Sequence, residues 1–276
     1  MTQFTTEIRE LISYIEHVGL EIMKIYETDF SHELKGDDSP LTQADMLSHN
    51  LITKYLKEHF EDYGVLSEES ENENGLDEKE FIWVIDPLDG TKDFIHKTDE
   101  FSIMVGLLNG DRESVLGIVH VPAQHTTYVG IKDEGSYKIQ NGVSTRITVN
   151  TISQFFDTTL VRSRNHFSTF DEEVCEKLGI KEFIKCGSCG VKFGRIAEGN
   201  AELCYYTTSH LGVWDSCAAE IILKEAGGEV FDKFGNEIVY DIVGRKMRNG
   251  FIGTNGNLSK ETVSDVIQEI LREKEN

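Results

Sequence analysis

One segment in the first third of the chain constrains its fold and chemistry more than any other. A short apolar run, residues 81–85, predicts a buried strand. It ends in Asp86, and Asp89 follows three positions later, so the two carboxylates can converge on one hard cation. Gly90 and Thr91 come next, where a helix can begin and offer backbone N–H groups to a phosphate. An ordinary Asp-Pro turn is the alternative for either aspartate alone, but the whole segment predicts a site for metal and phosphate.

Three further carboxylates occupy comparable positions elsewhere. Glu68 follows a second short apolar run at residues 63–66 and is therefore also placed at a strand end, although the acidic stretch after it is typical of a solvated loop. Asp45 lies three residues after Thr42, a spacing that resembles a helix capping arrangement. Asp215 opens a segment of small residues that predicts a helix, where an acid can simply interact with the helix dipole.

The order of these motifs resembles that of the inositol monophosphatase superfamily, a group of magnesium-dependent, lithium-sensitive phosphomonoesterases. Its three signatures are similar to residues 68–70 (Glu-Glu-Ser), 86–91 (Asp-Pro-Leu-Asp-Gly-Thr) and 214–215 (Trp-Asp). The resemblance extends over nearly the whole chain, from Lys35 to the glycine pair at 227–228. It implies an α/β fold with α+β lobes, arranged as a layered αβαβα sandwich of the sugar-phosphatase type.

Within this superfamily the chain resembles the 3′(2′),5′-bisphosphate nucleotidase branch. Members of that branch often carry Lys and Phe where this sequence has Lys92 and Phe94, and the segments 161–166 and 187–188 indicate the same branch. The resemblance implies Mg²⁺-dependent hydrolysis of 3′(2′)-phosphoadenosine 5′-phosphate to AMP and phosphate by a metal-activated water. An inositol-1-monophosphatase or a related sugar phosphatase is the alternative.

The resemblance also implies roles for individual residues. Two to three Mg²⁺ ions would be held by Glu68, Asp86, Leu88 through its carbonyl, Asp89 and Asp215. The catalytic residues would be Thr91, Asp45, which orients it, and Glu68. The substrate would be bound by Gly90, Thr91, Arg164, His166, Ser188 and Lys192. Arginine and lysine are also common on solvated surfaces. An inositol phosphatase would instead need an acid for the sugar hydroxyls, such as Glu198 or Asp171.

The composition limits the partners of this chain. Its 276 residues carry a formal net charge of −22, which excludes a general nucleic-acid-binding surface because such a surface needs clustered basic residues. No apolar run is long enough to span a bilayer, and Glu7, Arg9 and Glu10 stand where a signal peptide would be apolar. We therefore expect a cytoplasmic protein without integral membrane insertion that acts on a small phosphorylated substrate. A homodimer is left open.

The five cysteines do not decide the function. Their odd number argues against a secreted disulfide framework. Cys186 and Cys189 form a Cys-x-x-Cys pattern, but zinc would need a second pair or histidines at ligand spacing. Structural thiols are favoured over a redox-responsive pair. A phosphate-binding or redox-sensing protein without turnover is a further alternative, which a broken metal set would favour; all five carboxylates are present.

Hydrophobic periodicity predicts two lobes of different construction. In the first half it indicates helices over residues 4–22 and 42–60, and strands near 65 and over 81–85, 102–107, 114–120 and 127–131. A loop at 141–144 and a strand at 146–149 indicate the seam. Residues 1–145 would form an N-terminal α+β lobe carrying most metal ligands, and residues 146–276 a C-terminal α/β lobe that completes the site. That second half alternates strands at 159–161, 182–185 and 203–206 with helices at 170–178, 191–198 and 215–225.

Overall fold

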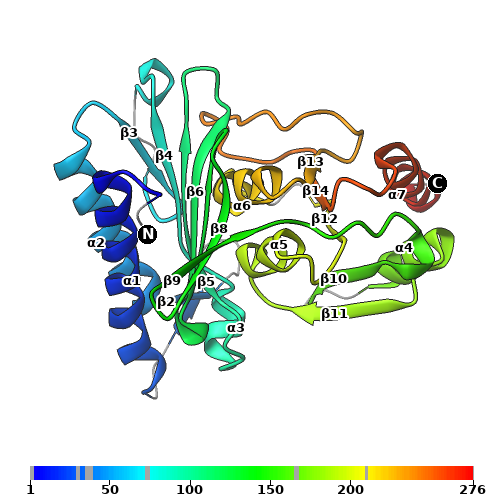
Figure 1. Cartoon of the computed structure of the whole chain (residues 1–276), viewed down its shortest axis with the longest axis horizontal. Coiled ribbons are helices and arrows are strands. Elements are labelled where there is room, and N and C mark those ends of the chain that lie inside the picture. Colours follow the sequence, from blue (N-terminus) through cyan, green and yellow to red (C-terminus); the bar gives the residue numbers. More distant parts are fainter. Residues whose placement is uncertain are drawn as a thin grey trace.

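Five layers of secondary structure stack in the order helix, sheet, helix, sheet, helix (Figure 1). The computed structural model describes residues 3–28, 32–34, 40–71, 75–164, 168–208 and 211–275. Helices α1 and α2 form the first layer, α5 and α6 lie between the two sheets, and α4 and α7 form the last layer. This mixed α/β arrangement confirms the layered sandwich expected from the sequence.

The sequence-based elements reappear with shifted bounds. The helices are α1 (Thr6–Tyr26), α2 (Gln43–His59), α3 (Thr91–Ile95), α4 (Thr169–Leu178), α5 (Cys189–Ala197), α6 (Trp214–Glu225) and α7 (Lys260–Glu275), with the short turns η1 (Leu76–Glu78), η2 (Pro122–Gln124) and η3 (Phe155–Asp157). The strands are β1 (His32–Leu34), β2 (Pro40–Thr42), β3 (Gly64–Ser67), β4 (Ile82–Asp89), β5 (Ser102–Leu108), β6 (Ser114–Val121), β7 (Thr126–Ile131), β8 (Gly135–Gln140), β9 (Val143–Ile147), β10 (Thr159–Ser163), β11 (Glu182–Cys186), β12 (Leu203–Tyr206), β13 (Glu229–Phe231) and β14 (Phe251–Thr254). In the described part of the chain, no helix combines the length and the apolar composition that crossing a bilayer requires.

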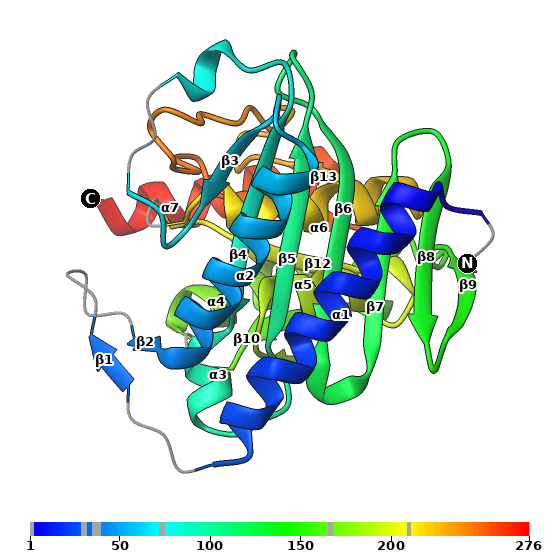
Figure 2. The same ribbon diagram turned by 90° about the vertical axis from the view of Figure 1, so that its left-hand side faces the viewer.

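Strands β3 to β9 form a seven-stranded sheet in which neighbours in sequence are neighbours in space. Strands β3 and β4 are parallel, and the other pairs are antiparallel. Helices α1 and α2 cover one face (Figure 2). They do so because their apolar residues recur at helical spacing; in α1, Leu11, Ile15, Val18 and Ile22 are buried.

Three glycines allow α6 to lie directly on the other face of this sheet. Gly106 of β5, Gly117 of β6 and Gly130 of β7 are register partners in three adjacent strands. A Cβ atom at Gly117 would lie 2.2 Å from the carbonyl oxygen of Ala218, and one at Gly106 would lie 2.5 Å from the Cys217 sulfur. Larger residues here would push α6 away from the sheet. The glycine row therefore sets the position of the helix and of the acid at its N-terminus.

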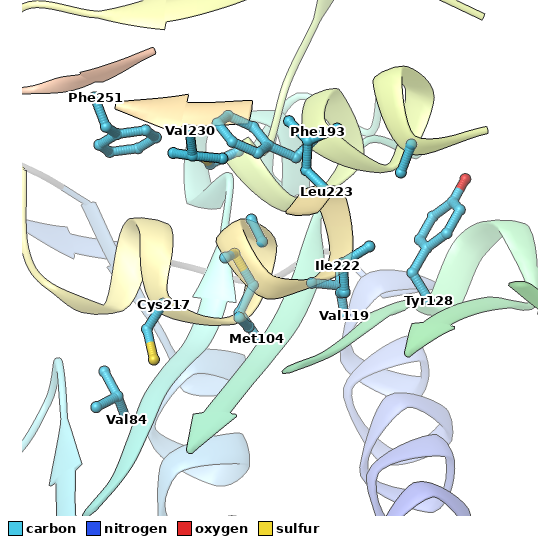
Figure 3. Packing of buried hydrophobic residues seen from close by; sticks show 14 of the residues in the cluster. Val84, Met104, Val119, Tyr128, Phe193, Cys217, Ile222, Leu223, Val230 and Phe251 are labelled. Atoms are coloured by element: carbon cyan, nitrogen blue, oxygen red, sulfur yellow. The ribbon is translucent and has the colours of Figure 1, made fainter. Parts of the chain in front are cut away.

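The second sheet has the strand order β11-β10-β12-β14-β13. Strands β10, β11 and β12 are parallel, and β14 is antiparallel to both its neighbours. A hydrophobic core fills the space between the sheets around α5 and α6. Figure 3 shows Cys217 and Ile222 of α6 on the side of Met104 of the first sheet, and Leu223 beside Phe193 of α5. The middle helix layer thus packs against both sheets.

The expected strand at residues 81–85 is too short. Strand β4 continues to Asp89, because Asp86 pairs with Met104 and Asp89 pairs with Ser102 of β5. Three steps along β4 match two along β5, so one extra residue bulges out between the pairs. Proline in this stretch cannot donate a ladder hydrogen bond, which suits a bulge.

The expected seam between residues 145 and 146 falls inside a strand. Strand β9 runs from Val143 to Ile147 and pairs along its length with β8, so all of it belongs to the first sheet. Asn141 and Gly142 form the hairpin turn between these strands, both with positive φ. The two sheets divide after β9. Strands β1, β2, β8, β13 and β14 and helix α7 were not expected from the sequence.

We expect Gly117→Ala to destabilise the protein by about 1–3 kcal/mol, because the new methyl group meets the backbone of α6 and forces the helix to shift. Urea unfolding followed by circular dichroism measures this change. Gly110→Ala is the matched control, since a Cβ there would make only an ordinary contact at 3.7 Å. Equal stability of the Gly117 and Gly110 variants would show that α6 does not depend on the glycine row.

Candidate active site

Two carboxylates of β4 and one of α6 meet between the sheets. Asp86 and Asp89 come from the bulged end of β4, and Asp215 is the second residue of α6. Each offers one oxygen, and these oxygens all lie within 4.8 Å of one another. Asp86 and Asp89 are buried, and Asp215 is half-buried. The structure therefore brings together three residues that the sequence singled out from distant positions.

The bulge in β4 is what lets two of these side chains share one side of the strand. In a regular strand, residues three apart point to opposite faces. The extra residue between Asp86 and Asp89 removes this opposition. The N–H of Leu88 then donates to Asp86 Oδ1 at 3.0 Å, which fixes the first carboxylate.

Burial and mutual repulsion make these carboxylates hard to ionise. Loss of hydration raises the pKa of Asp86 well above its usual range, and the charges of Glu68, Asp89 and Asp215 raise it further. Burial, followed by the charges of Glu68 and Asp89, raises the pKa of Asp215 to about 8. A cation among these oxygens would favour their ionised form.

Glu68 stands beside this group at the end of β3. Its backbone N–H donates to the Ile85 carbonyl of β4 at 3.0 Å, which continues the parallel pairing of the two strands. The side chain is half-buried. Its charge contributes to the raised pKa values of both Asp86 and Asp215, so Glu68 belongs to the same electrostatic group.

Asp45 both caps α2 and contacts Thr91. Its Oδ2 atom accepts hydrogen bonds from the Thr42 N–H at 2.7 Å and the Thr42 hydroxyl at 2.6 Å, which completes a capping box. Its Oδ1 atom lies 3.2 Å from the Thr91 hydroxyl. The same hydroxyl lies 3.1 Å from the Leu88 carbonyl. Capping and the contact with Thr91 are therefore compatible roles.

The N-terminus of α5 is joined to Asp89. The Asp89 Oδ2 atom accepts hydrogen bonds from the Ser188 hydroxyl at 2.5 Å and the Gly190 N–H at 2.9 Å. Ser102 donates to the same oxygen at 3.3 Å. Ser188 caps α5 through the Val191 N–H. The predicted substrate residue Ser188 thus contacts a predicted metal ligand.

The two described cations predicted to bind substrate lie near Ser188. Lys192 is buried and donates to the Ser188 carbonyl at 3.2 Å and to the Tyr206 hydroxyl at 2.9 Å. Arg164 pairs with Glu100 at 2.5 Å and with Asp93 at 3.4 Å. Its side chain remains 38% exposed. The third predicted residue, His166, lies outside the described residues.

The acids considered for an inositol substrate have other partners. Glu198 follows the last residue of α5, at the opposite end from Ser188, and accepts a hydrogen bond from Lys138 at 2.6 Å. Asp171 belongs to the capping box of α4 and pairs with Arg162 at 3.0 Å. Neither contact leads to the carboxylate group between the sheets.

Cys186 and Cys189 are buried free thiols. Burial raises the pKa of Cys186 to about 11 and also raises that of Cys189 well above its usual range. Thiols of this kind are poor nucleophiles near neutral pH because little thiolate is present. Helix α5 begins at Cys189, and both cysteines belong to the hydrophobic core between the sheets.

The donor set fits a hard divalent cation. Every ligand atom is an oxygen, which Mg²⁺ prefers over nitrogen and sulfur. Within the part of the chain that the structure describes, Asp86 has no basic partner and accepts one hydrogen bond, from the Leu88 N–H. A buried carboxylate without a counter-ion is costly, and a cation would supply the missing charge.

Three residues of the site region were missed by the sequence reasoning. Ser102 contacts Asp89, Glu100 accepts hydrogen bonds from Arg164 and the Gly187 N–H, and Arg245 donates to the Ser67 carbonyl. Strand register places Ser102 opposite Asp89. A long loop brings Arg245 to the Ser67 carbonyl. Neither relation leaves a local signal in the sequence. Only the position of Glu100 just before β5 hinted that it lies at this edge of the sheet.

Comparison with known proteins finds one family and several of its members. The profile of the inositol monophosphatase family matches residues 5–271. A 3′(2′),5′-bisphosphate nucleotidase CysQ of Haemophilus influenzae is 35% identical over 84% of this chain and 85% of its own. Inositol monophosphatase 1 of Solanum lycopersicum is 28% identical over 85% of this chain and 84% of its own.

Solved structures resemble the whole fold. CysQ from Bacteroides thetaiotaomicron superimposes with a TM-score of 0.77 at 28% identity, covering 92% of this chain and 98% of that one. An IMPase from Thermotoga maritima gives a TM-score of 0.82 at 26% identity, covering 98% and 99%. These matches confirm the family resemblance on which the sequence-based residue roles rest.

We expect the metal-free protein to lose stability as the pH rises from 3.8, the usual pKa of an aspartate, to about 8, the pKa of folded Asp215. In this window the unfolded state releases the proton that the folded state retains, so unfolding is favoured. In EDTA, the Tm of the wild type should therefore fall more steeply with pH than that of Asp215→Asn, and Mg²⁺ should reduce the fall. Parallel slopes for both proteins in EDTA would contradict the crowding of Asp215.

Proposed function

Because this chain belongs to the inositol monophosphatase family, we propose that its carboxylate group is the metal centre of a 3′(2′),5′-bisphosphate nucleotidase. The substrate would be 3′(2′)-phosphoadenosine 5′-phosphate, and the products AMP and phosphate. The observation that carries the proposal is the meeting of the Asp86, Asp89 and Asp215 oxygens within 4.8 Å. The CysQ relatives support the nucleotidase branch, whereas family membership alone supports a phosphatase.

We propose that the centre takes Mg²⁺, with two to three ions held by Glu68, Asp86, Leu88 through its carbonyl, Asp89 and Asp215. Bound ions would neutralise phosphate charge and lower the pKa of a water. The protein supplies the geometry. Asp89 is oriented by Ser188 and Gly190, and Asp86 by the Leu88 N–H, so both carboxylates are held in place before any ion binds.

Thr91 is proposed to position the attacking water. Its hydroxyl has one hydrogen and two acceptors within reach, the Leu88 carbonyl and Asp45 Oδ1. With that hydrogen engaged, the lone pairs of Thr91 Oγ1 can accept a hydrogen bond from water. As the water passes a proton to Thr91 Oγ1, the hydroxyl proton of Thr91 can pass to Asp45 Oδ1, 3.2 Å away. Glu68 is proposed to act on the same water from β3.

The backbone around Gly90 is proposed to hold the phosphate that is cleaved. Gly90 has φ +90°, and a Cβ there would lie 3.1 Å from both the Glu100 carbonyl and the Ser188 N. A side chain at this position would therefore be strained and crowded. With Gly90 in this conformation, α3 begins at Thr91, and the N–H groups of both residues are candidates for phosphate oxygens.

The second phosphate of the substrate is assigned to the cations near Ser188. Lys192 is buried within reach of the Ser188 carbonyl, so a phosphate there would meet a charge with little competing water. Arg164 is partly exposed and would exchange its contacts with Glu100 and Asp93 for the phosphate. His166 is retained as a further candidate.

Hydrolysis of inositol 1-phosphate or a related sugar phosphate is the second candidate function. The tomato relative named inositol monophosphatase 1 favours it. The contacts of Glu198 and Asp171 described above do not. Lithium sensitivity, a cytoplasmic location and a homodimer are further proposals, of which the first follows from the resemblance to the family.

We expect Thr91→Ala to lower kcat by about 10²–10⁴-fold, the usual range for loss of a group that assists proton transfer. The KM for substrate should change little, because the lost contact is made to water and not to the nucleotide. Thr91→Ser keeps the hydroxyl and serves as the control. Steady-state phosphate release measures both. Near-normal kcat in Thr91→Ala would leave Thr91 as a structural residue.

We expect 3′-phosphoadenosine 5′-phosphate to be hydrolysed with much higher kcat/KM than inositol 1-phosphate or fructose 1,6-bisphosphate. The uncleaved 5′-phosphate adds a charge-assisted contact of about 1.5–3 kcal/mol, or about ten- to a hundredfold in affinity. EDTA should abolish the activity and Mg²⁺ restore it. A preference for inositol 1-phosphate would overturn the nucleotidase assignment and leave the phosphatase family in place.

The role of Arg164 can be checked in the same assay. Arg164→Ala should reduce kcat/KM for the bisphosphate more than for a simple phosphate monoester. Equal losses on both substrates would make Arg164 a structural partner of Glu100.

A further inference from the structure

A long loop joins β13 to β14 and reaches the metal-ligand region. Residues 232–250 form no strand or helix, yet several of their side chains are buried. In both Figure 1 and Figure 2 this loop, in orange, lies at the same end of the molecule as the cyan segment after β3. Loops of this length within a compact fold usually have a function.

Arg245, in this loop, holds the turn that carries Glu68. One guanidinium nitrogen donates to the Ser70 carbonyl at 2.8 Å. The other donates to the Ser67 carbonyl at 2.6 Å and lies 3.3 Å from the Glu68 carbonyl. The planar fork of arginine suits several acceptors at once, which a lysine ammonium cannot match in the same geometry. Arg245 thus fixes the backbone on both sides of Glu68.

The same residue also holds the segment that leads into Asp215. The Arg245 guanidinium lies over the Trp214 ring at 5.0 Å, and the Arg245 carbonyl accepts a hydrogen bond from the Val213 N–H at 3.2 Å. Asp215 in turn accepts a hydrogen bond from the Gly212 N–H at 2.6 Å. One side chain and its own backbone therefore contact both segments that bring acids to the centre.

Hydrogen bonds hold this loop against α6 and against the segment that precedes α6. Tyr240 donates to Glu220 of α6 and lies 2.9 Å from the Ser216 hydroxyl. The Met247 N–H donates to the Leu211 carbonyl at 2.9 Å. Arg245 itself has φ +57°, which costs free energy for a residue with a side chain and persists where the surroundings impose it.

We propose that Arg245 is a positioning residue that sets the separation of Glu68 from Asp215 and thereby the metal affinity of the centre. Glu68 follows β3 and Asp215 is the second residue of α6, so neither strand pairing nor a shared helix fixes their separation. Arg245 touches the backbone next to both. The inference rests on the proposed metal-dependent function, and it concerns how the protein holds its own carboxylates.

Mg²⁺ binding measured by titration calorimetry, without substrate, tests the proposal. We expect Arg245→Ala to raise the Kd for Mg²⁺ by about ten- to a hundredfold, as loss of residues that orient metal ligands typically does. Turnover should fall at low Mg²⁺ and recover in part at high Mg²⁺, with little change in the KM for substrate. Arg245→Lys should bind Mg²⁺ more weakly than the wild type and serves as a second variant if Arg245→Ala folds poorly.

Arg112→Ala is the matched control. Arg112 also has a positive φ, +62°, and donates to two carbonyls of a neighbouring loop, those of Lys79 at 2.8 Å and Asp77 at 2.7 Å. Asp77 and Lys79 lie at the far end of the β3–β4 connection from Glu68, and the β5–β6 turn that holds Arg112 carries no proposed metal ligand. Arg112→Ala should lower the Tm without changing the Kd for Mg²⁺ more than twofold.

Unchanged Mg²⁺ affinity in both Arg245 variants would overturn the proposal, as would an equal loss in Arg112→Ala. The proposed function fails separately. A wild type that binds Mg²⁺ but does not hydrolyse the bisphosphate would overturn the nucleotidase assignment, while the comparison of Kd values would still decide the role of Arg245.

Discussion

The direct packing of α6 on the seven-stranded sheet is the contact on which the centre depends. Gly106, Gly117 and Gly130 remove the side chains that would separate the helix from the strands. The helix can then bring Asp215 to the end of β4. Without this approach, no acid of α6 would lie beside the carboxylates of β4. The contact of α6 with the glycine row therefore determines the geometry of the site at the end of β4.

The carboxylate group works against the stability of the metal-free fold. Burial, followed by the charges of the neighbouring acids, raises the pKa values of Asp86 and Asp215, which means that ionising them costs free energy. The surrounding core and the hydrogen bonds to Asp89 hold the acids together against this repulsion. A group of buried acids is suited to bind a cation, because the positive charge offsets the free-energy cost of ionising them. Affinity and local instability thus have the same origin.

The sequence predicted what is encoded locally and missed what depends on register and long loops. The acids of β4 were found because a strand end, a turn-forming proline and a helix start follow one another within a few residues. The family resemblance linked them to Glu68 and Asp215. Nothing in the sequence showed that β4 would continue to Asp89, because pairing with Ser102 decides it. The seam was expected too early, since the sequence around Val143 can form either a loop or the edge strand that it is.

The proposed ligands come from β3, β4 and α6, which meet only in the folded protein. A cation bound by all of them binds the folded state and not the unfolded chain, so it stabilises the fold by an amount that grows with its concentration relative to Kd. Arg245 takes part in the same balance, because its hydrogen bonds to the Ser67 and Ser70 carbonyls hold the turn at Glu68 before a cation arrives. Because the turn is already ordered, the free energy of cation binding is not reduced by the cost of ordering it. The loop between β13 and β14 therefore joins the second sheet to the turn at Glu68, beside the first sheet.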